Sequence, residues 1–573
     1  GGCSMKYTGA QIVIECLIEQ GVDTVFGYPG GAILNIYDEL YKNEKRLRHI
    51  LTAHEQGASH AADGYARSTG KVGVVMATSG PGATNLVTGI ATAYMDSVPI
   101  VAITCNVIAP LLGKDSFQEI DIAGVTMPVT KHNFIVRDVG KLADTIREAF
   151  FIAKTGRPGP VLIDIPKDVT ASSCDYVPAD ASPDAQFSKR KASLHRIMKV
   201  CNVSDEKINK LASLINASER PFIYAGGGVV ISDACEELKA LAEKAQIPVS
   251  MSLMGKSAFP NTHALSTGMI GMHGTKASNT AVDKCDLLLA IGTRFSDRVI
   301  GDPKRFAGKA KIVQIDVDPA EVNKNIAVHD SLVGNIKDAL SRLLPLVEKR
   351  KASEWNAKID EWKAEVPPSR KQNGKISPKA IFEYVNGKVP SDTIVTTEVG
   401  QHQMWTALFY HFEKPRTFLT SGGLGTMGFG TGAAIGAQLA NPDKKVVHFA
   451  GDGSFRMNCN ELATISHYGL PIIIIIFNNG ALGNVRQWQT LFYEKRYSAT
   501  TLDFAPDFVK LADAYGVAGV RVTSEAEFKK AFDAALASGK AAVIDAAIDK
   551  DEMVLPMIPP GKSVDRIMMD IDL

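Results

Sequence analysis

The sequence lacks the features that mark nucleic-acid-binding and membrane-spanning proteins. It has 63 Lys and Arg residues against 62 Asp and Glu, so its formal net charge is +1, and no long basic block stands out. Nucleic-acid-binding domains usually show a clear excess of positive charge. No uncharged apolar stretch reaches the ~18 residues of a membrane-spanning helix, because Asp96 and two prolines interrupt the long apolar region 86–112. We therefore expect a soluble protein with no nucleic-acid or membrane partner.

Cysteine is also scarce, and its eight positions include no Cys-x-x-Cys pair. The absence of such pairs argues against a zinc knuckle and against a thioredoxin-like redox motif. The pattern is typical of buried, reduced thiols in a cytoplasmic enzyme. We interpret residues 1–4, ahead of Met5, as an expression scar and expect no signal peptide. The cysteines are Cys3, Cys16, Cys105, Cys174, Cys201, Cys235, Cys285 and Cys459.

What the sequence does contain is the composition of an ordinary globular protein, with 45% hydrophobic and 22% charged residues. At ~150 residues per domain, a length of 573 residues predicts three or four domains. Apolar strands alternate with amphipathic helices, and this alternation predicts parallel sheets covered by helices on both faces. We predict an α/β protein of three doubly wound parallel-sheet domains, at 5–175, 195–350 and 375–573.

Turn and cap signals locate the individual elements. Thr8 and Gln11 have the capping-box spacing at the start of a helix that ends near Gly21. The polar stretch 172–193 is a predicted linker, and the charged stretch 348–371 is a predicted linker helix and loop. Five consecutive isoleucines within 472–477 are too few to cross a membrane and fit a fully buried parallel strand. The predicted strands are 23–26, 99–104, 160–165, 221–224, 286–291, 311–315, 446–450 and 472–477.

The sharpest chemical signal is a carboxylate and an amide at the ends of two successive predicted strands. Asp452 stands between Gly451 and Gly453 after one strand, and Asn479 follows the next. Open α/β sheets bind ligands at these carboxyl ends. Oxygen donors suit Mg²⁺, which shares its shell with phosphates, and the glycines let the backbone approach a diphosphate. Each motif alone fits an ordinary turn, but both together favour a cofactor site.

The stretch 451–479 resembles the diphosphate-binding motif of thiamine diphosphate enzymes, and further motifs narrow the resemblance to the acetohydroxyacid synthase (acetolactate synthase) catalytic-subunit family. The resemblance covers nearly the whole chain from Met5 and implies the thiamine diphosphate-enzyme fold. It also implies an activity: decarboxylation of pyruvate and ligation of the hydroxyethyl carbanion to a second 2-ketoacid, pyruvate or 2-ketobutyrate, in branched-chain amino-acid biosynthesis. The motifs lie at 27–31 (GYPGG), 53–58 (AHEQGA), 113–119 (GKDSFQE), 271–275 (GMHGT), 400–405 (GQHQMW), 425–430 (GTMGFG) and 486–488 (RQW).

The resemblance also implies catalytic roles. Glu55 matches the glutamate that hydrogen-bonds the cofactor's pyrimidine ring and drives the tautomerisation needed to remove the C2 proton. Met427 matches the residue that keeps the cofactor bent, Arg298 the cation for the second ketoacid's carboxylate, and Trp488 the aromatic that favours 2-ketobutyrate. Taken alone, Glu55 also suits a helix N-terminus, Arg298 a pair with Asp297, and Trp488 a core position. Three further residues fall on active-site positions: Phe117, Gln118 and Lys131.

Three cofactors are implied by the resemblance: thiamine diphosphate, Mg²⁺ and FAD. From the residues alone, Gly226–Gly228 is a weak phosphate-loop signal, and the middle domain could be a structural relic without flavin. The residues that match thiamine diphosphate contacts are Tyr28, Pro29, Gly30, Gly400, Gln401, His402, Gly425, Met427, Gly451, Gly453 and Ser454. Those that match metal ligands are Asp452, Asn479 and Ala481. Those that match FAD contacts are Arg157, Gly226, Gly227, Gly228, Leu253, Met254, His273, Gly292, Arg294 and Asp316.

Two kinds of protein partner are implied in the same way. In the family, the glutamate and the diphosphate domain of one active site come from different subunits, so we expect a homodimer with two shared sites, or a tetramer. A separate small regulatory subunit is the second expected partner.

The chain departs from the family's pattern in three places. Residues 105–110 read CNVIAP where family members usually have GQVPTS, Asn484 replaces a Met, and Ser296 replaces an Asp. In the family, the first two places line the channel to C2, where herbicides bind. A buried amide needs hydrogen-bond partners, so we hypothesise a reshaped channel with altered acceptor range or inhibitor sensitivity. Neutral drift is the alternative.

Other readings remain open at this stage. A related pyruvate oxidase or decarboxylase would release acetate or acetaldehyde, but it would have no reason to keep Arg298 together with the 486–488 motif. An oxalyl-CoA decarboxylase would need a coenzyme A signature, and a glyoxylate carboligase lacks the glutamate found at Glu55. A non-catalytic nucleotide-binding protein would have no use for Glu55 and the Asp452–Asn479 pair.

Overall fold

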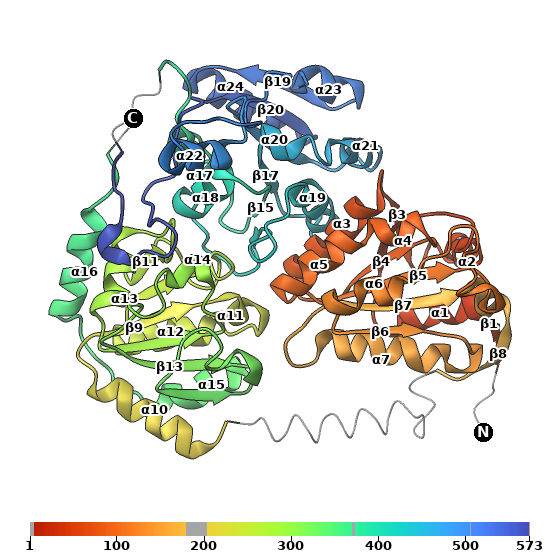
Figure 1. Ribbon diagram of the computed structural model, residues 1–573, viewed down its shortest axis with the longest axis horizontal. Helices are drawn as coiled ribbons and strands as arrows, with labels where there is room; N and C mark the ends of the chain where they lie inside the picture. The colour runs from red at the N-terminus through yellow and green to blue at the C-terminus, as the bar shows by residue number, and fades with distance from the viewer. Residues whose placement is uncertain (1–4, 179–202, 369–372, 505, 572–573) are drawn as a thin grey trace.

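Three six-stranded parallel sheets form the framework of the protein (Figure 1). The computed structural model describes residues 5–178, 203–368, 373–504 and 506–571. Helices cover both faces of each sheet, which confirms the predicted doubly wound α/β class. Cys3, Cys201 and most of the predicted linker 172–193 lie outside the described residues. Six other cysteines are free thiols, and none of the described helices is long and apolar enough to cross a membrane.

The first sheet has the strand order β3-β2-β4-β5-β7-β6, and a short antiparallel pair, β1 and β8, closes this unit. The capping box predicted for Thr8 and Gln11 forms at the start of α1. The strands are β1 (Met5–Thr8), β2 (Thr24–Tyr28), β3 (Arg48–Leu51), β4 (Gly73–Ala77), β5 (Ile100–Asn106), β6 (His132–Ile135), β7 (Val161–Pro166) and β8 (Ser173–Tyr176). The helices are α1 (Gly9–Glu19), α2 (Leu34–Lys42), α3 (Glu55–Thr69), α4 (Pro81–Asn85), α5 (Val87–Asp96), α6 (Ile122–Thr126), α7 (Leu142–Lys154) and α8 (Lys167–Ala171).

The middle sheet has the order β11-β10-β9-β12-β13-β14. The predicted linker 348–371 contains a helix, α16, whose Trp355 is buried and donates to the carbonyl of Pro221 at the start of β9. The strands are β9 (Pro221–Ala225), β10 (Val249–Met251), β11 (Ser266–Met269), β12 (Leu287–Ile291), β13 (Lys311–Asp316) and β14 (Asp330–Val333). The helices are α10 (Asp205–Ala217), α11 (Gly227–Ile231), α12 (Cys235–Ala245), α13 (Lys276–Lys284), α14 (Asp297–Ile300), α15 (Ile336–Leu343) and α16 (Glu354–Ala364).

The third sheet has the order β16-β15-β17-β18-β20-β19, and the five isoleucines of β18 lie buried between β17 and β20 as predicted. Its central strands run one residue past their predicted ends, because Gly451 and Asn478 still occupy ladder positions opposite Phe477 and Ala547. The strands are β15 (Ile394–Thr397), β16 (Phe418–Leu419), β17 (Val446–Gly451), β18 (Ile472–Asn478), β19 (Ala518–Val522) and β20 (Ala542–Ala547). The helices are α17 (Pro378–Asn386), α18 (Gln401–Phe409), α19 (Phe429–Ala440), α20 (Asp452–Phe455), α21 (Leu462–His467), α22 (Gly483–Phe492), α23 (Phe508–Ala514) and α24 (Glu525–Ser538).

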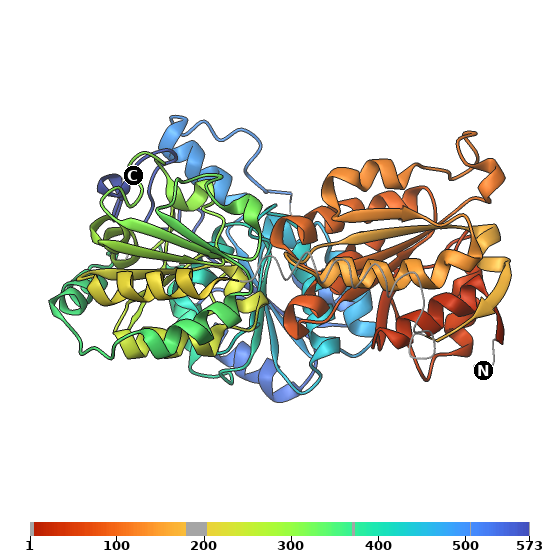
Figure 2. The same ribbon diagram turned by 90° about the horizontal axis from the view of Figure 1, so that it is seen from below.

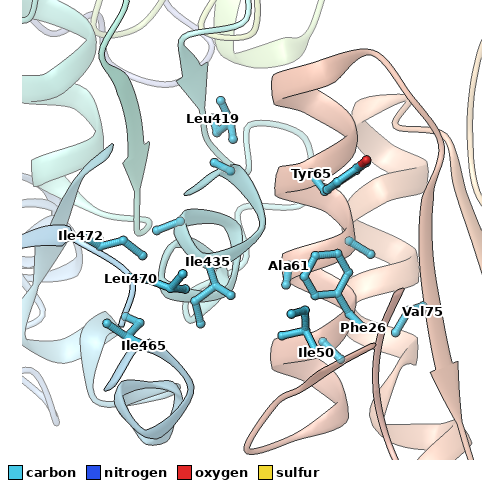
Figure 3. Close-up of a cluster of buried hydrophobic side chains, with 14 of the residues drawn as sticks. Phe26, Ile50, Ala61, Tyr65, Val75, Leu419, Ile435, Ile465, Leu470 and Ile472 are labelled. Atoms are coloured by element: carbon cyan, nitrogen blue, oxygen red, sulfur yellow. The ribbon is translucent and has the colours of Figure 1, made fainter. Parts of the chain in front are cut away.

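The first and middle sheets lie at opposite ends of the molecule, and the third unit joins them (Figures 1 and 2). Helix α3 of the first unit packs against α19 of the third, and one continuous hydrophobic core spans both (Figure 3). The two helices meet at backbone distance: a Cβ on Gly436 would lie 1.8 Å from the carbonyl oxygen of Ala61, and one on Gly64 would lie 2.2 Å from that of Ala433.

Adding a methyl group at Gly436 tests this close packing. We expect Gly436→Ala to lower the free energy of unfolding by about 1–3 kcal/mol, because the new Cβ would force α3 and α19 apart. In an open helix the same change would be mildly stabilising. Gly31→Ala is the matched control, since a Cβ there meets no atom within 4 Å. Urea unfolding measures both variants, and equal midpoints would contradict the packing.

Candidate active site

A small cavity of about 70 Å³ lies at the carboxyl ends of β15, β17 and β18, where the sequence predicted the diphosphate site. Asp452 begins α20 directly after β17, and Asn479 follows β18 by one residue. The structure therefore brings together the two residues on which the prediction depended. The predicted residues that line the cavity are Gly400, Gln401, His402, Met427, Gly451, Asp452, Gly453, Ser454, Asn479 and Ala481.

The donor atoms of this cavity suit a hard cation. Asp452 is buried, its Oδ2 has no hydrogen-bond partner among the described residues, and burial raises its pKa to about 7. Asn479 Oδ1 accepts a hydrogen bond of 3.1 Å from the Ala481 N–H. No group of three or more His, Cys, Asp or Glu in the described ranges could hold a metal. A cation here would therefore use one carboxylate, amide and carbonyl oxygens, and oxygens of its ligand, which is the set that Mg²⁺ prefers.

Backbone rather than side chains forms much of the cavity wall. A Cβ on Gly483 would lie 2.1 Å from Gln401 Oε1, and a Cβ on Gly453 would lie 2.5 Å from Leu482 Cδ2. His402 is buried and neutral at pH 7, since burial lowers its pKa to about 3, and within the described chain its Nε2 has no partner. Unsatisfied buried polar atoms are costly unless a ligand completes them. The residues present therefore fit a bound diphosphate with its metal.

Contacts from both the first and the third unit position Glu55. It is the first residue of α3, is 9% exposed, and accepts a hydrogen bond of 3.0 Å from Asn85 Nδ2. The preceding backbone is held by Glu461 of the third unit, which accepts from the N–H groups of Ala53 and His54 at 3.2 and 3.1 Å. Sequence analysis missed Asn85 and Glu461, because their contacts join residues 30 and more than 400 positions apart.

Glu55 does not line the Asp452 cavity, and neither do Phe117 and Gln118. Phe117 is 87% exposed, and Gln118 adopts a left-handed backbone (φ 58°) beside Gly80. Within one chain, Glu55, Phe117 and Gln118 therefore lie outside the cavity that contains the predicted diphosphate-binding residues. Tyr28 at the end of β2, with Pro29 and Gly30 after it, also lies outside this cavity.

Lys131 has a structural environment. Its ammonium group donates to the carbonyl oxygens of Ile152 and Thr155 at the end of α7, where cations satisfy free carbonyls. Burial lowers the pKa of Lys131 to about 8. Lys131 lines neither the Asp452 cavity nor a second, larger cavity beside the middle unit, so a catalytic role for it stays a prediction.

A larger cavity of about 510 Å³ lies between the middle unit and its two neighbours. It is large enough for a cofactor-sized molecule. Asp316 ends β13 within it, and burial raises the pKa of this carboxyl to about 6. A Cβ on Gly226 would lie 2.1 Å from the carbonyl oxygen of Gly292, so only glycine fits beside this wall. All ten predicted FAD residues line the cavity: Arg157, Gly226, Gly227, Gly228, Leu253, Met254, His273, Gly292, Arg294 and Asp316.

The two predicted acceptor-site residues, Arg298 and Trp488, both line this larger cavity and contact each other. The guanidinium carbon of Arg298 lies 5.9 Å from the ring centroid of Trp488. The Arg298–Asp297 pair, at 3.7 Å and with both side chains more than 60% exposed, is weak. Trp488 is half-buried rather than a core residue. Arg298 thus keeps a free face toward the cavity, as an anion-binding cation requires.

Asn484 lines both cavities and therefore lies where they approach each other. Its Oδ1 is enclosed and has no hydrogen-bond partner in the part of the chain that the structure describes. Ser296 also lines the larger cavity, whereas the departure at 105–110 lies at the end of β5 in the first unit and lines neither cavity. There Asn106 is satisfied, since it donates to Asp164 Oδ2 at 2.8 Å and to the carbonyl of Ile120 at 3.2 Å.

Comparison with known proteins matches three domain models to the chain. Residues 7–125 match the N-terminal TPP binding domain of thiamine pyrophosphate enzymes, 208–343 their central domain, and 398–546 their C-terminal TPP binding domain. The chain is 50% identical, over 98% of its length and 95% of the relative's, to a probable acetolactate synthase large subunit of Methanocaldococcus jannaschii. It is 47% identical to the acetolactate synthase large subunits of Parasynechococcus marenigrum (97% and 90% covered) and Corynebacterium glutamicum (99% and 91%).

Proposed function

Because the chain belongs to the acetolactate synthase large-subunit family of thiamine pyrophosphate enzymes, we propose that it decarboxylates pyruvate, releasing carbon dioxide, and joins the remaining two-carbon unit to a second ketoacid. A second pyruvate would give 2-acetolactate, and 2-ketobutyrate would give 2-aceto-2-hydroxybutyrate. One observation carries this assignment within the chain. The Arg298–Trp488 pair stands in a cavity that shares Asn484 with the Asp452 cavity. A bound cofactor and an acceptor ketoacid would therefore be neighbours.

The proposed cofactors are thiamine diphosphate, Mg²⁺ and FAD. When bound, thiamine diphosphate supplies the electron sink that stabilises a carbanion formed from pyruvate. Asp452, Asn479 and the Ala481 carbonyl are the proposed magnesium ligands, and the backbone of 451–454 accommodates the diphosphate. Met427 supports the cofactor from the cavity wall. The larger cavity, with its ten lining residues, is the proposed FAD site.

The substrate-binding groups of the chain have distinct tasks. The carboxylate of Glu55, held by the hydrogen bond from Asn85, would hydrogen-bond the pyrimidine ring of a bound cofactor and supply acid–base chemistry there. Arg298 binds the carboxylate of the second ketoacid in a two-point contact. Trp488 provides apolar surface for the extra methyl group of 2-ketobutyrate.

Two copies of the chain would complete two active sites. Glu55 lies outside the Asp452 cavity of its own chain, and the first unit also carries several exposed large apolar side chains. Clusters of exposed apolar residues mark protein–protein interfaces. The residues are Tyr28, Ile108, Leu111, Phe117 and Met127. A small regulatory subunit is a further proposed partner, because the relatives are named large subunits.

Incubation with pyruvate, thiamine diphosphate, Mg²⁺ and FAD, followed by mass spectrometry of the products, tests the proposed function. Acetolactate is the expected product. Acetate or acetaldehyde in its place would contradict the proposal and favour a pyruvate oxidase or decarboxylase.

Arg298→Ala tests the acceptor site. We expect the ratio of acetolactate to acetaldehyde to fall by about 10- to 100-fold, because the second ketoacid loses a charge-assisted hydrogen bond while the first is still decarboxylated. Arg305→Ala is the matched control, since Arg305 is another exposed arginine of the middle unit and pairs with Asp565 at 3.2 Å. The same loss in both variants would mean that the effect is not specific to the acceptor site.

Restoring the family's residues tests the hypothesis of a reshaped channel. We expect Asn484→Met to change the preference for 2-ketobutyrate over pyruvate by about 3- to 10-fold, because an apolar side chain replaces an unsatisfied amide between the cavities. Ile108→Pro, on the surface of the first unit, tests the departure at 105–110. Product ratios from mixed substrates, with and without an inhibitor, provide the measurement. Unchanged values in both variants would favour neutral drift.

A further inference from the structure

Glu398 is a buried acid that takes part in none of the proposed binding or catalytic roles. It directly follows β15, two residues before Gly400, and its side chain is 0% exposed. It lines neither the Asp452 cavity nor the larger cavity, so it does not face a bound cofactor or substrate. A buried acid normally has a specific structural or functional reason, because taking a charge out of water is costly.

Both carboxylate oxygens of Glu398 accept hydrogen bonds from backbone N–H groups at the start of α19. Its Oε2 accepts from the Gly428 N–H at 2.6 Å, and its Oε1 accepts from the N–H groups of Gly430 and Thr431 at 2.9 and 3.2 Å. These are free donors at a helix N-terminus, where a carboxylate also interacts favourably with the helix dipole. His448 Nε2 lies 3.8 Å from Glu398 Oε1, and burial lowers the pKa of His448 to about 4. Burial raises the pKa of Glu398 to about 7, so above this pH the three backbone N–H groups, rather than the neutral imidazole, are the main partners of its carboxylate.

The first of these hydrogen bonds holds the peptide group that follows Met427. The next carbonyl is held as well, since Asn458 Nδ2 donates to the Gly428 oxygen at 2.7 Å. On the other side, the Thr426 N–H donates to Ser421 Oγ at 3.0 Å. Gly428 itself has a left-handed backbone, φ 90°, which brings this turn close to Asn458. The backbone on both sides of Met427 is therefore immobilised, while the Met427 side chain lines the cavity.

We propose that Glu398 is a positioning residue that sets the place of Met427 in the cavity wall, and thereby the shape of the bound cofactor, without touching the cofactor. A carboxylate suits this task better than an amide. Its two oxygens accept all three N–H groups, whereas a glutamine would turn its own N–H donors toward some of them. The inference rests on the proposed function, because it assigns to Met427 the support of thiamine diphosphate.

A double-mutant cycle tests whether Glu398 acts through Met427. We expect Glu398→Gln to lower kcat by about 10- to 100-fold, because a displaced Met427 no longer holds the cofactor in its reactive shape. The KM for pyruvate and the Kd for thiamine diphosphate should stay within about 3-fold, because Asp452 and Asn479 are unchanged. In a Met427→Ala background the further substitution at Glu398 should have almost no effect. Equal losses of kcat in the two backgrounds would overturn the proposal.

Hydrogen exchange gives a second readout that needs no activity. In the full-length chain without cofactor, we expect the backbone of 428–431 to exchange at least about 10-fold faster in Glu398→Gln, because three protecting acceptors are weakened. Asp286→Asn is the matched control, since Asp286 accepts from the N–H groups of Glu219 and Arg220, far from this cavity. It should leave 428–431 unchanged. Unaltered exchange in Glu398→Gln would overturn the proposal.

Two further comparisons keep the test decisive. If Glu398→Gln does not fold, Glu398→Asp keeps the charge but is one methylene shorter; we expect it to show faster exchange at 428–431 and reduced kcat, and wild-type values for both would overturn the proposal. If the unmodified protein makes no acetolactate, the proposed function fails, while hydrogen exchange still decides whether Glu398 holds the start of α19.

Discussion

Glu55→Gln is expected to lower acetolactate formation by about 10²- to 10⁴-fold, the usual contribution of a positioned acid–base group. The substitution is nearly isosteric, and the amide oxygen can still accept the hydrogen bond that Asn85 now donates at 3.0 Å. Protein stability and the affinity for thiamine diphosphate should therefore change little, and the loss should appear in kcat. The rate of acetolactate formation at saturating pyruvate is the measurement.

Glu39→Gln is the matched control for this prediction. Glu39 is a glutamate of the same unit with similar burial (8% exposed), but it pairs with Lys42 on α2 and lines neither cavity. We expect its activity to equal that of the unmodified protein. Retained activity in Glu55→Gln, or an equal loss in the control, would remove Glu55 from the catalytic machinery.

Asp452→Asn is expected to have opposite effects on cofactor binding and on stability. The Mg²⁺-dependent affinity for thiamine diphosphate should fall by about 100-fold or more, because the site loses its only predicted anionic metal ligand. Without cofactor and metal, the variant should be more stable at pH 8 by about 1–3 kcal/mol, because a buried carboxylate with one unsatisfied oxygen is removed. Fluorescence titration and thermal unfolding in EDTA measure the two effects.

The stability difference should depend on pH with a defined sign. Burial raises the pKa of Asp452 to about 7 from an ordinary value near 3.8. At this group the folded protein therefore holds a proton that the unfolded chain releases, and the contribution of Asp452 to stability falls as pH rises from about 4 to 7. The advantage of Asp452→Asn should grow over this range and be constant above it. An advantage that is largest at pH 4 would contradict the assignment.

The two variants together test whether active sites are shared between chains. Each alone should be inactive, but a mixed dimer of Glu55→Gln and Asp452→Asn chains would have one intact site, built from Glu55 of one chain and Asp452 of the other. Random pairing should then restore about a quarter of the full activity, since half of the dimers are mixed and each has one good site of two. No recovery after refolding the chains together would contradict the shared-site proposal.

Local signals in the sequence were sufficient for many of the elements, whereas most of the predicted cavity residues came from the family resemblance. The capping box at Thr8 and Gln11 and the buried isoleucine strand are both present where they were predicted. A turn, a cap and a strand depend on neighbours within a few positions, so their sequence patterns are readable directly. Asp452 and Asn479 meet for the same kind of reason, because the ends of adjacent parallel strands lie together in a sheet.

Contacts between units could not be read in this way. The backbone-close crossing of α3 and α19 at Gly436, and the hold of Glu461 on the residue before Glu55, join parts of the chain that lie hundreds of positions apart. Glu398 was not singled out in the sequence, and the strand that it follows, β15, was not among the predicted strands. Nothing local indicates that its oxygens accept from Gly428, 30 residues away.

The sequence by itself thus determined the fold class, the strand ends that gather the polar groups, and the family. Only the tertiary structure decided that Glu461 holds the backbone before Glu55, that Asn484 lies between two cavities, and that Glu398 holds the backbone beside Met427. The physical reason is that secondary structure follows from short-range hydrogen bonds and periodicity. The placement of one unit against another follows from the packing of side chains and backbone surfaces that the chain brings together only on folding.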